Sequence, residues 1–261
     1  MITGFDHVVI AVRDIAAGAA AYETLLGANA GPIVTRDDVA SVLVVTSNLT
    51  VELMARVGPG AARLSAALDE GGEGLKSLVF ATPDVERLHT RCQRVGLEPE
   101  EIVRRDEAQS FRASTERTHG ARLFFMQRTG PMTADAGILG LDHVVVRTPD
   151  AERAAALYGA RLALDMRLDR EVAGRRMTFF RCGDAIVEVV QDETLRDGRD
   201  KLWGLSWRVA DADAERARLA DAGLSVSEVR AGAKLGSRVF TVRDQTCGVP
   251  TLMIELGAKR D

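Results

Sequence analysis

The strongest constraint on the fold of this chain is an internal repeat. Residues 140–150 read GLDHVVVRTPD, and residues 4–14, 136 positions earlier, read GFDHVVIAVRD. Two weaker copies, Ser77–Asp84 and Gly204–Asp211, keep the short apolar run and the aspartate but lack the histidine. A supersecondary unit that recurs along a chain packs against its copies to build the fold. We therefore expect four copies of one unit, arranged as two similar halves.

Each copy is followed later by a short apolar strand that ends in a glutamate or glutamine. The four pairs of first-strand and last-strand positions are His7 and Glu52, Ser77 and Gln127, His143 and Glu188, and Gly204 and Glu255. The two histidine–glutamate pairs are each separated by 45 residues, and the other two pairs by 50 and 51. These spacings predict that the same two positions recur in every unit.

The first unit shows the expected order of elements, one strand, one helix and three strands. Residues 7–12 form a β-branched strand, and Asp14 is well placed to cap the helix that follows. Apolar residues then recur with helical period as far as Leu26, and Gly27 ends the helix. The three later strands are expected at residues 32–36, 41–46 and 49–54. Four such βαβββ units predict an α+β fold.

The halves are expected to form two tandem domains, residues 1–128 and 138–261. Their modules are residues 1–57 and 74–128 in the first domain, and 138–192 and 203–257 in the second. A chain of 261 residues is long enough for each domain to bury its own core. The segment Thr129–Gly137, rich in Gly, Pro and small residues, is the expected linker, and Glu70–Gly74 is the expected connector between the first two modules.

Composition excludes several classes of function. The net charge of −4 gives no basic footprint for nucleic acid or for an anionic membrane surface. Three widely spaced cysteines indicate neither a disulfide framework nor a cysteine-rich zinc site. No apolar stretch approaches the roughly 20 residues needed to cross a bilayer, and the first residues do not resemble a signal peptide. We expect a soluble, cytoplasmic protein with no nucleic-acid or membrane partner.

The repeated motifs resemble those of the vicinal oxygen chelate superfamily. They are D-H-V-V at residues 6–9 and 142–145, V-E-L at 51–53 and I-E-L at 254–256. Two further runs, GLKSLVFATPD at 74–84 and LFFMQ at 123–127, resemble its glyoxalase-like branch. The group includes glyoxalase I, extradiol dioxygenases, methylmalonyl-CoA epimerase, and the fosfomycin and bleomycin resistance proteins. The resemblance covers essentially the whole chain, and it implies paired modules whose mixed sheets curl around a cleft.

The resemblance also implies a divalent metal, held by first-strand and last-strand residues of two modules. In the second half the metal ligands would be His143, Glu188 and Glu255, with Gly204 where a fourth ligand stands in the family. In the first half the corresponding set is His7, Glu52, Ser77 and Gln127, a degenerate site with only two good ligands. Fe, Mn, Ni or Zn would suit the second set and would polarise substrate oxygens. A protein with no metal is equally compatible with these residues.

Strand alternation adds three polar residues to the second cleft. Arg147 lies four residues after His143, and Ser206 and Arg208 lie two and four residues after Gly204, so each should share a face with that first-strand position. Two interpretations are open. The arginines hold an anionic substrate beside a metal, or they pair with Glu188 and Glu255 and no metal binds.

Two functions follow from these alternatives. The first is a metal-dependent enzyme that acts on a small, oxygen-rich substrate, with isomerase, lyase or dioxygenase chemistry and with Glu188 or Glu255 as the general base. Dioxygenase chemistry of the extradiol type needs the second histidine that Gly204 replaces. The second function is a metal-free protein that sequesters a small molecule, as bleomycin resistance proteins do. In either case the fused halves replace the homodimer of single-half relatives, which leaves both a monomer and a homodimer open.

Overall fold

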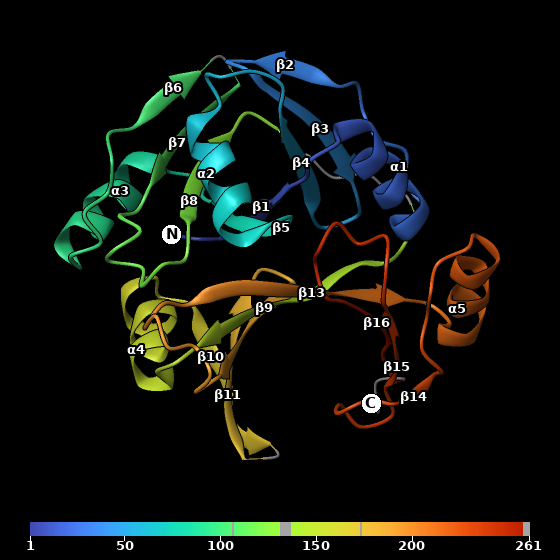
Figure 1. Cartoon of the computed structure of the whole chain (residues 1–261). Helices are drawn as coiled ribbons and strands as arrows, with labels where there is room; N and C mark the ends of the chain where they lie inside the picture. The colour runs from blue at the N-terminus through green and yellow to red at the C-terminus, as the bar shows by residue number, and fades with distance from the viewer. Residues whose placement is uncertain (106, 131–136, 173, 258–261) are drawn as a thin grey trace. The chain divides into compact units, whose positions relative to one another are not determined.

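The computed structural model describes residues 1–105, 107–130, 137–172 and 174–257, and they form two eight-stranded mixed sheets (Figure 1). The first sheet has the order β2 (Val34–Arg36), β3 (Val39–Val45), β4 (Thr50–Arg56), β1 (Gly4–Ala11), β5 (Gly74–Ala81), β8 (Leu123–Arg128), β7 (Ala108–Arg112) and β6 (Val103–Arg105). The second has the order β10 (Asp165–Val172), β11 (Arg175–Cys182), β12 (Ala185–Gln191), β9 (Gly140–Thr148), β13 (Lys201–Val209), β16 (Thr251–Glu255), β15 (Arg238–Val242) and β14 (Arg230–Ala231). The two orders match strand for strand, which confirms the predicted α+β fold of two tandem glyoxalase-like domains.

Strand directions within the modules also repeat. The first and last strands pair in parallel in three modules, β5 with β8, β9 with β12, and β13 with β16. The remaining strands pair antiparallel on the outer flank of each module. The domain boundaries at 128 and 138 stay a prediction, and residues 131–136 of the expected linker lie outside the described residues.

The aspartate found in all four copies has one structural role, the capping of a helix. The helices that follow the first strands are α1 (Ile15–Leu26), α3 (Val85–Arg94), α4 (Ala151–Ala155) and α5 (Ala212–Asp221). The side chains of Asp14, Asp84, Asp150 and Asp211 each accept hydrogen bonds from the first backbone N–H groups of these helices. An aspartate at this position satisfies amides that the helix itself leaves unbonded.

Each of these helices covers the strands of its own module. α1 contacts β3 and β4, α3 contacts β7 and β8, α4 contacts β11 and β12, and α5 contacts β15 and β16 (Figure 1). α4 continues as the π-helix η1 (Ala156–Arg161), which contains Tyr158. The opposite face of each sheet therefore has to be covered by something else or left open to a ligand.

The structure corrects the sequence analysis at one connector. Residues 62–71 form a further helix, α2 (Ala62–Gly71), which includes the first two residues of the expected connector Glu70–Gly74. The Ala- and Leu-rich sequence of α2 favours a helix, but its lack of a side-chain cap removed the usual start signal. α2 contacts β4, which therefore packs against two helices.

The described residues fall into two compact units. The first comprises Met1–Val8, Lys76–Met132 and His143–Trp203, and the second Val9–Leu75, Thr133–Asp142 and Gly204–Asp261. In the first unit, Arg161 at the end of η1 donates hydrogen bonds to the carbonyl oxygens of Val95, Gly96 and Arg117. The bonds to Val95 and Gly96 satisfy carbonyl groups just beyond the C-terminal end of α3, and the bond to Arg117 reaches the segment between β7 and β8. None of the described helices is long and apolar enough to cross a membrane.

In the second unit, the turn between β3 and β4 binds the segment that leads into β9. The Asn48 side chain donates to the Leu141 carbonyl oxygen at 2.9 Å and accepts from the Leu141 amide at 2.7 Å. Ser47 donates to the carbonyl of Leu139 at 2.9 Å. Gly140 between them has φ +104°, and a Cβ there would lie 2.3 Å from Asn48 Oδ1, so only glycine fits. The two halves of the sequence are thus joined by hydrogen bonds within this unit.

We expect Asn48→Ala to destabilise the protein by about 2 kcal/mol, because it leaves the buried Leu141 amide without this partner. The measurement is the midpoint of urea unfolding followed by circular dichroism. Ser47→Ala, which removes one bond from the same turn, serves as the matched control and should cost roughly half as much. Equal midpoints for Asn48→Ala and the wild type would show that the hydrogen bonds between Asn48 and Leu141 do not stabilise the fold.

Candidate functional site

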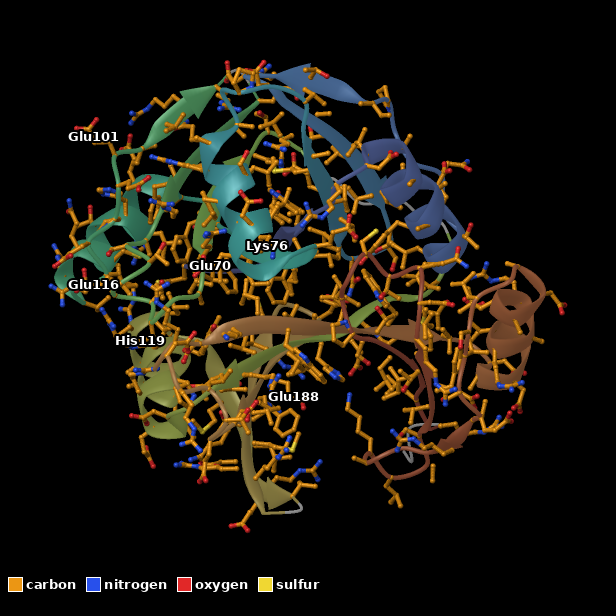
Figure 2. The ribbon with its side chains drawn as sticks, viewed as in Figure 1. Glu70, Lys76, Glu101, Glu116, His119 and Glu188 are labelled. Atoms are coloured by element: carbon orange, nitrogen blue, oxygen red, sulfur yellow. The ribbon has the colours of Figure 1, made fainter. Side chains whose placement is uncertain are left out.

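His143 and Glu188, the best-supported pair from the sequence, are in direct contact. His143 Nε2 lies 3.2 Å from Glu188 Oε2, and their side chains are 12% and 11% exposed. In the parallel ladder between β9 and β12, His143 is opposite Ile186 and Glu188 is opposite Val145. Because residues two apart on a strand share a face, both side chains lie on the same side of the sheet. Glu188 lies on β12 beside the neighbouring strand β11 (Figure 2).

The pair lies on the face that α4 does not cover. The residues of β9 and β12 that alternate with the pair, Val144, Val146, Val187 and Val189, are almost fully buried on the helix side. On the side of the pair, Phe179 is opposite Glu188 and Met177 is opposite Val190, and these apolar residues are half-buried. The arrangement is an acid–base pair beside apolar side chains, which suits a small organic molecule with a polar group.

Arg147 lies on this face but is already engaged. Its guanidinium group forms an ion pair with Asp192, whose side chain is 1% exposed, and lies 5.6 Å from the centre of the Trp203 ring. One interpretation of the sequence paired the arginines with Glu188 and Glu255, but Arg147 pairs with Asp192 instead. The acidic partner is Asp192, which the sequence analysis did not single out.

A second arginine on the same face was missed by the sequence analysis. Arg170 lies on β10 opposite Met177, and its guanidinium carbon lies 5.5 Å from the centre of the Phe179 ring. The sequence pattern did not predict a strand at 165–172, where five of the eight residues are charged. The alternation of Leu168, Arg170 and Val172 with Arg167, Asp169 and Glu171 was the available signal.

The structure places Glu255 beside a helix N-terminus. Ser206 and Arg208 on β13 are opposite Leu252 and Ile254 on β16, whereas Glu255 is opposite Val209. Glu255 therefore lies on the other face of the strand from Ser206 and Arg208. Its Oε2 accepts a hydrogen bond from the Ala212 amide at 2.8 Å, and Arg238 Nη1 lies 3.4 Å away. Glu255 binds the N-terminus of α5, where the helix dipole favours negative charge.

Gln127 has the same role in the second module. Its Oε1 accepts a hydrogen bond from the Val85 amide, the first residue of α3, at 3.0 Å. A carboxylate and an amide oxygen both accept from a backbone N–H, so Glu and Gln are interchangeable in this role. Gln127 and Glu255, which end the 50- and 51-residue spacings, therefore bind the helix of their module. Glu188, which ends the 45-residue spacing in the second half, faces away from the helix of its module.

The other expected residues of β13 are placed as follows. Arg208 donates from Nε and Nη2 to the Leu141 carbonyl oxygen. Ser206 is 1% exposed, and its hydroxyl has no hydrogen-bond partner among the described residues. A Cβ on Gly204 would lie 2.8 Å from the Pro250 carbonyl oxygen, so the backbone leaves no room for a side chain at the position of the fourth ligand.

The first half contains a different polar cluster. His7 Nδ1 lies 2.6 Å from Asp6 Oδ1, and Arg128 Nε lies 3.0 and 2.9 Å from the two oxygens of Asp6. Burial acts to raise the pKa of the Asp6 carboxyl, but the hydrogen bond and charge of His7, together with Arg128, outweigh it and lower that pKa. Ser77 is buried on β5. Glu52 is half-buried on β4 opposite Leu43.

The donor set does not fit the metal that the resemblance implies. Three protein ligands are the usual minimum for a catalytic metal, and the expected third ligand, Glu255, binds a helix N-terminus and Arg238. Across residues 1–105, 107–130, 137–172 and 174–257, no group of three or more His, Cys, Asp or Glu side chains is arranged to hold an ion. His143 and Glu188 supply two metal ligands, one fewer than this minimum.

Comparison with known protein families agrees with the repeat and the sheet order. The model of the glyoxalase-like domain matches residues 5–163. The chain belongs to the glyoxalase-like branch of the vicinal oxygen chelate superfamily. The model of the glyoxalase/bleomycin resistance protein/dioxygenase superfamily matches residues 142–241, in the second half. A search of curated protein sequences gave no match.

Solved structures of this superfamily share the fold at low sequence identity. A mutant of 4-hydroxymandelate synthase from Streptomyces coelicolor is 17% identical, with a TM-score of 0.78 over 100% of this chain and 95% of that one. BphC, a halotolerant catechol dioxygenase, is 11% identical, with a TM-score of 0.70 over 100% of this chain and 89% of that one. At these identities the likeness shows a common architecture.

The helix-binding role of Glu255 predicts a graded response to substitution. Glu255→Gln should cost less than about 1 kcal/mol, because the amide oxygen still accepts from Ala212, whereas Glu255→Ala should cost about 1–2 kcal/mol. Gln127→Ala is the matched variant in the second module and should cost about 1 kcal/mol. Urea unfolding measures all three. Equal losses for Glu255→Gln and Glu255→Ala would rule out the shared role.

The depressed pKa of Asp6 predicts how its contribution to stability depends on pH. A carboxyl with a lowered pKa in the folded state stabilises the protein above its unfolded pKa, ordinarily 3.8, and the contribution declines as the pH falls. We expect Asp6→Asn to cost about 1–2 kcal/mol at pH 7 and progressively less below pH 3.8. Urea unfolding of the variant and the wild type across this range is the measurement, and a cost that stays constant below pH 3.8 would contradict the prediction.

Proposed function

We propose that the second half binds a small organic molecule on the face that carries His143 and Glu188, and that it does so without a metal. The observation that supports this most directly is the position of Glu255, which binds the N-terminus of α5 and so does not join His143 and Glu188 as a third metal ligand. Such a pair binds a polar group of a ligand by hydrogen bonds, while Phe179, Met177 and Val190 supply apolar contact. This function corresponds to the ligand-sequestering members of the superfamily.

The comparison of the two halves favours the second half as the binding site. In the first half, α2 lies between β4 and β5 in the sequence and contacts β4 in addition to α1. Residues 192–200, at the equivalent place between β12 and β13, are all described and contain no helix. The strand that carries Glu188 therefore lacks the additional helix that packs on its counterpart β4.

A second candidate function is proton transfer on the bound molecule. A histidine and a carboxylate 3.2 Å apart can exchange a proton, so one can remove a proton from a carbon next to a carbonyl while the other returns it to a neighbouring position. This reaction would be an isomerisation with no net change in atoms or electrons. It uses the same side chains as binding, and turnover of a bound ligand would distinguish the two functions.

Metal titration tests the proposal. Protein treated with a chelator should bind no stoichiometric Mn, Fe(II), Ni or Zn, measured by calorimetry and by elemental analysis after gel filtration. His143→Ala and Glu188→Gln should behave as the wild type does, because two donors hold a divalent ion weakly. One equivalent of metal in the wild type that both variants lose would overturn the metal-free proposal.

A further inference from the structure

Arg170, on the proposed binding face, has no partner of opposite charge among the described residues. Arg170 makes no hydrogen bond or ion pair with any described residue, and its buried Nε is left without an acceptor. The neighbouring acids on β10 do not compensate it. Asp169 and Glu171 alternate to the other face of the strand, and Asp169 is bound by Arg176.

Several other arginines of the same unit have an acidic partner. Arg147 pairs with Asp192, Arg153 with Asp200, and Arg176 with Asp169 and Glu152. Burying a donor without an acceptor costs free energy, so the buried Nε of Arg170, with no acidic partner beside it, would be stabilised by an acceptor from a ligand. The guanidinium group of Arg170 is instead held against the ring of Phe179.

The position of Arg170 relates it to the acid–base pair. Phe179 is opposite Glu188 in one ladder and opposite Leu168 in the next, and Arg170 is two residues along β10 from Leu168. β10 and β12 are two strands apart, which places the guanidinium group roughly 10 Å from the Glu188 carboxylate. A molecule of one ring with a short substituent spans that distance.

The ring of Phe179 holds the guanidinium group at a cation–π distance, with 5.5 Å between the ring centre and the guanidinium carbon. A guanidinium group presents its N–H donors in a rigid fork that can meet both oxygens of a planar anion. Charge-assisted bonds of this kind are stronger than neutral ones, and a planar carboxylate or a phosphate matches the fork of donors. The chemistry of Arg170 therefore selects an oxyanion.

We infer that Arg170 binds the anionic end of the ligand, a carboxylate or phosphate, while the other end contacts His143 and Glu188. This inference rests on the proposed function of the face and adds a ligand class to it. It transfers to Arg170 the role that the sequence analysis assigned to Arg147 and Arg208, both of which have other partners.

A matched pair of probes tests the inference. Benzoate and benzamide have the same ring and nearly the same size, but only benzoate carries a charge. NMR titration of the whole protein should show benzoate shifting the Arg170 Nε–H signal and the His143 ring signals, and binding roughly tenfold more tightly than benzamide. Arg170→Met keeps an apolar chain on Phe179 and should remove that preference while leaving benzamide binding unchanged.

Arg167→Met is the control, since it removes the same charge from an exposed, Asp165-paired position on the same strand. It should leave the preference for benzoate intact. Equal binding of the two probes with shifts at His143 would overturn the role of Arg170 and keep the proposed function. Absence of any shift at both His143 and Arg170 would overturn both. Loss of the preference in Arg167→Met as well would show general charge attraction and would also overturn the inference.

Discussion

The alternation of side chains along paired strands decides which residues of this molecule can act together. Each sheet has one face against helices, and a shift of one residue along a strand transfers a side chain from that face to the other. Glu188 and Glu255 both lie on a last strand and both follow an apolar run, Glu188 in the middle of β12 and Glu255 at the end of β16. Glu188 lies beside His143, whereas Glu255 binds the N-terminus of α5. A difference of one position along a strand thus decides whether a glutamate faces a candidate ligand or serves a structural role.

The repeat shows how structural and functional needs were divided among the four modules. The capping aspartate is present in all of them, because every module starts a helix after its first strand. The histidine is present in two, where it meets different partners, Asp6 in the first half and Glu188 in the second. Residues that serve the shared architecture recur, and residues that serve a site are free to differ.

Much of the fold was predictable from the sequence, because the repeat fixes the order of elements and the strands are β-branched. The pair His143 and Glu188 was predictable for the same reason, as its 45-residue spacing occurs twice. The roles of Glu255 and Gln127 were not, since insertions before β8 and β16 hide the strand register and spacing alone does not give the face. Arg170 was missed because β10 is exposed and charged, so neither apolar periodicity nor a turn signal marks it.

The close approach of Gly204 to Pro250 has a consequence for engineering a metal site in the second half. The carbonyl oxygen of Pro250 occupies the space that any side chain at residue 204 would need. A histidine introduced at 204 would therefore have to displace the backbone at 250 before it could act as a ligand. Adding an imidazole to this strand requires a new path for the chain at 250 as well as a new residue at 204.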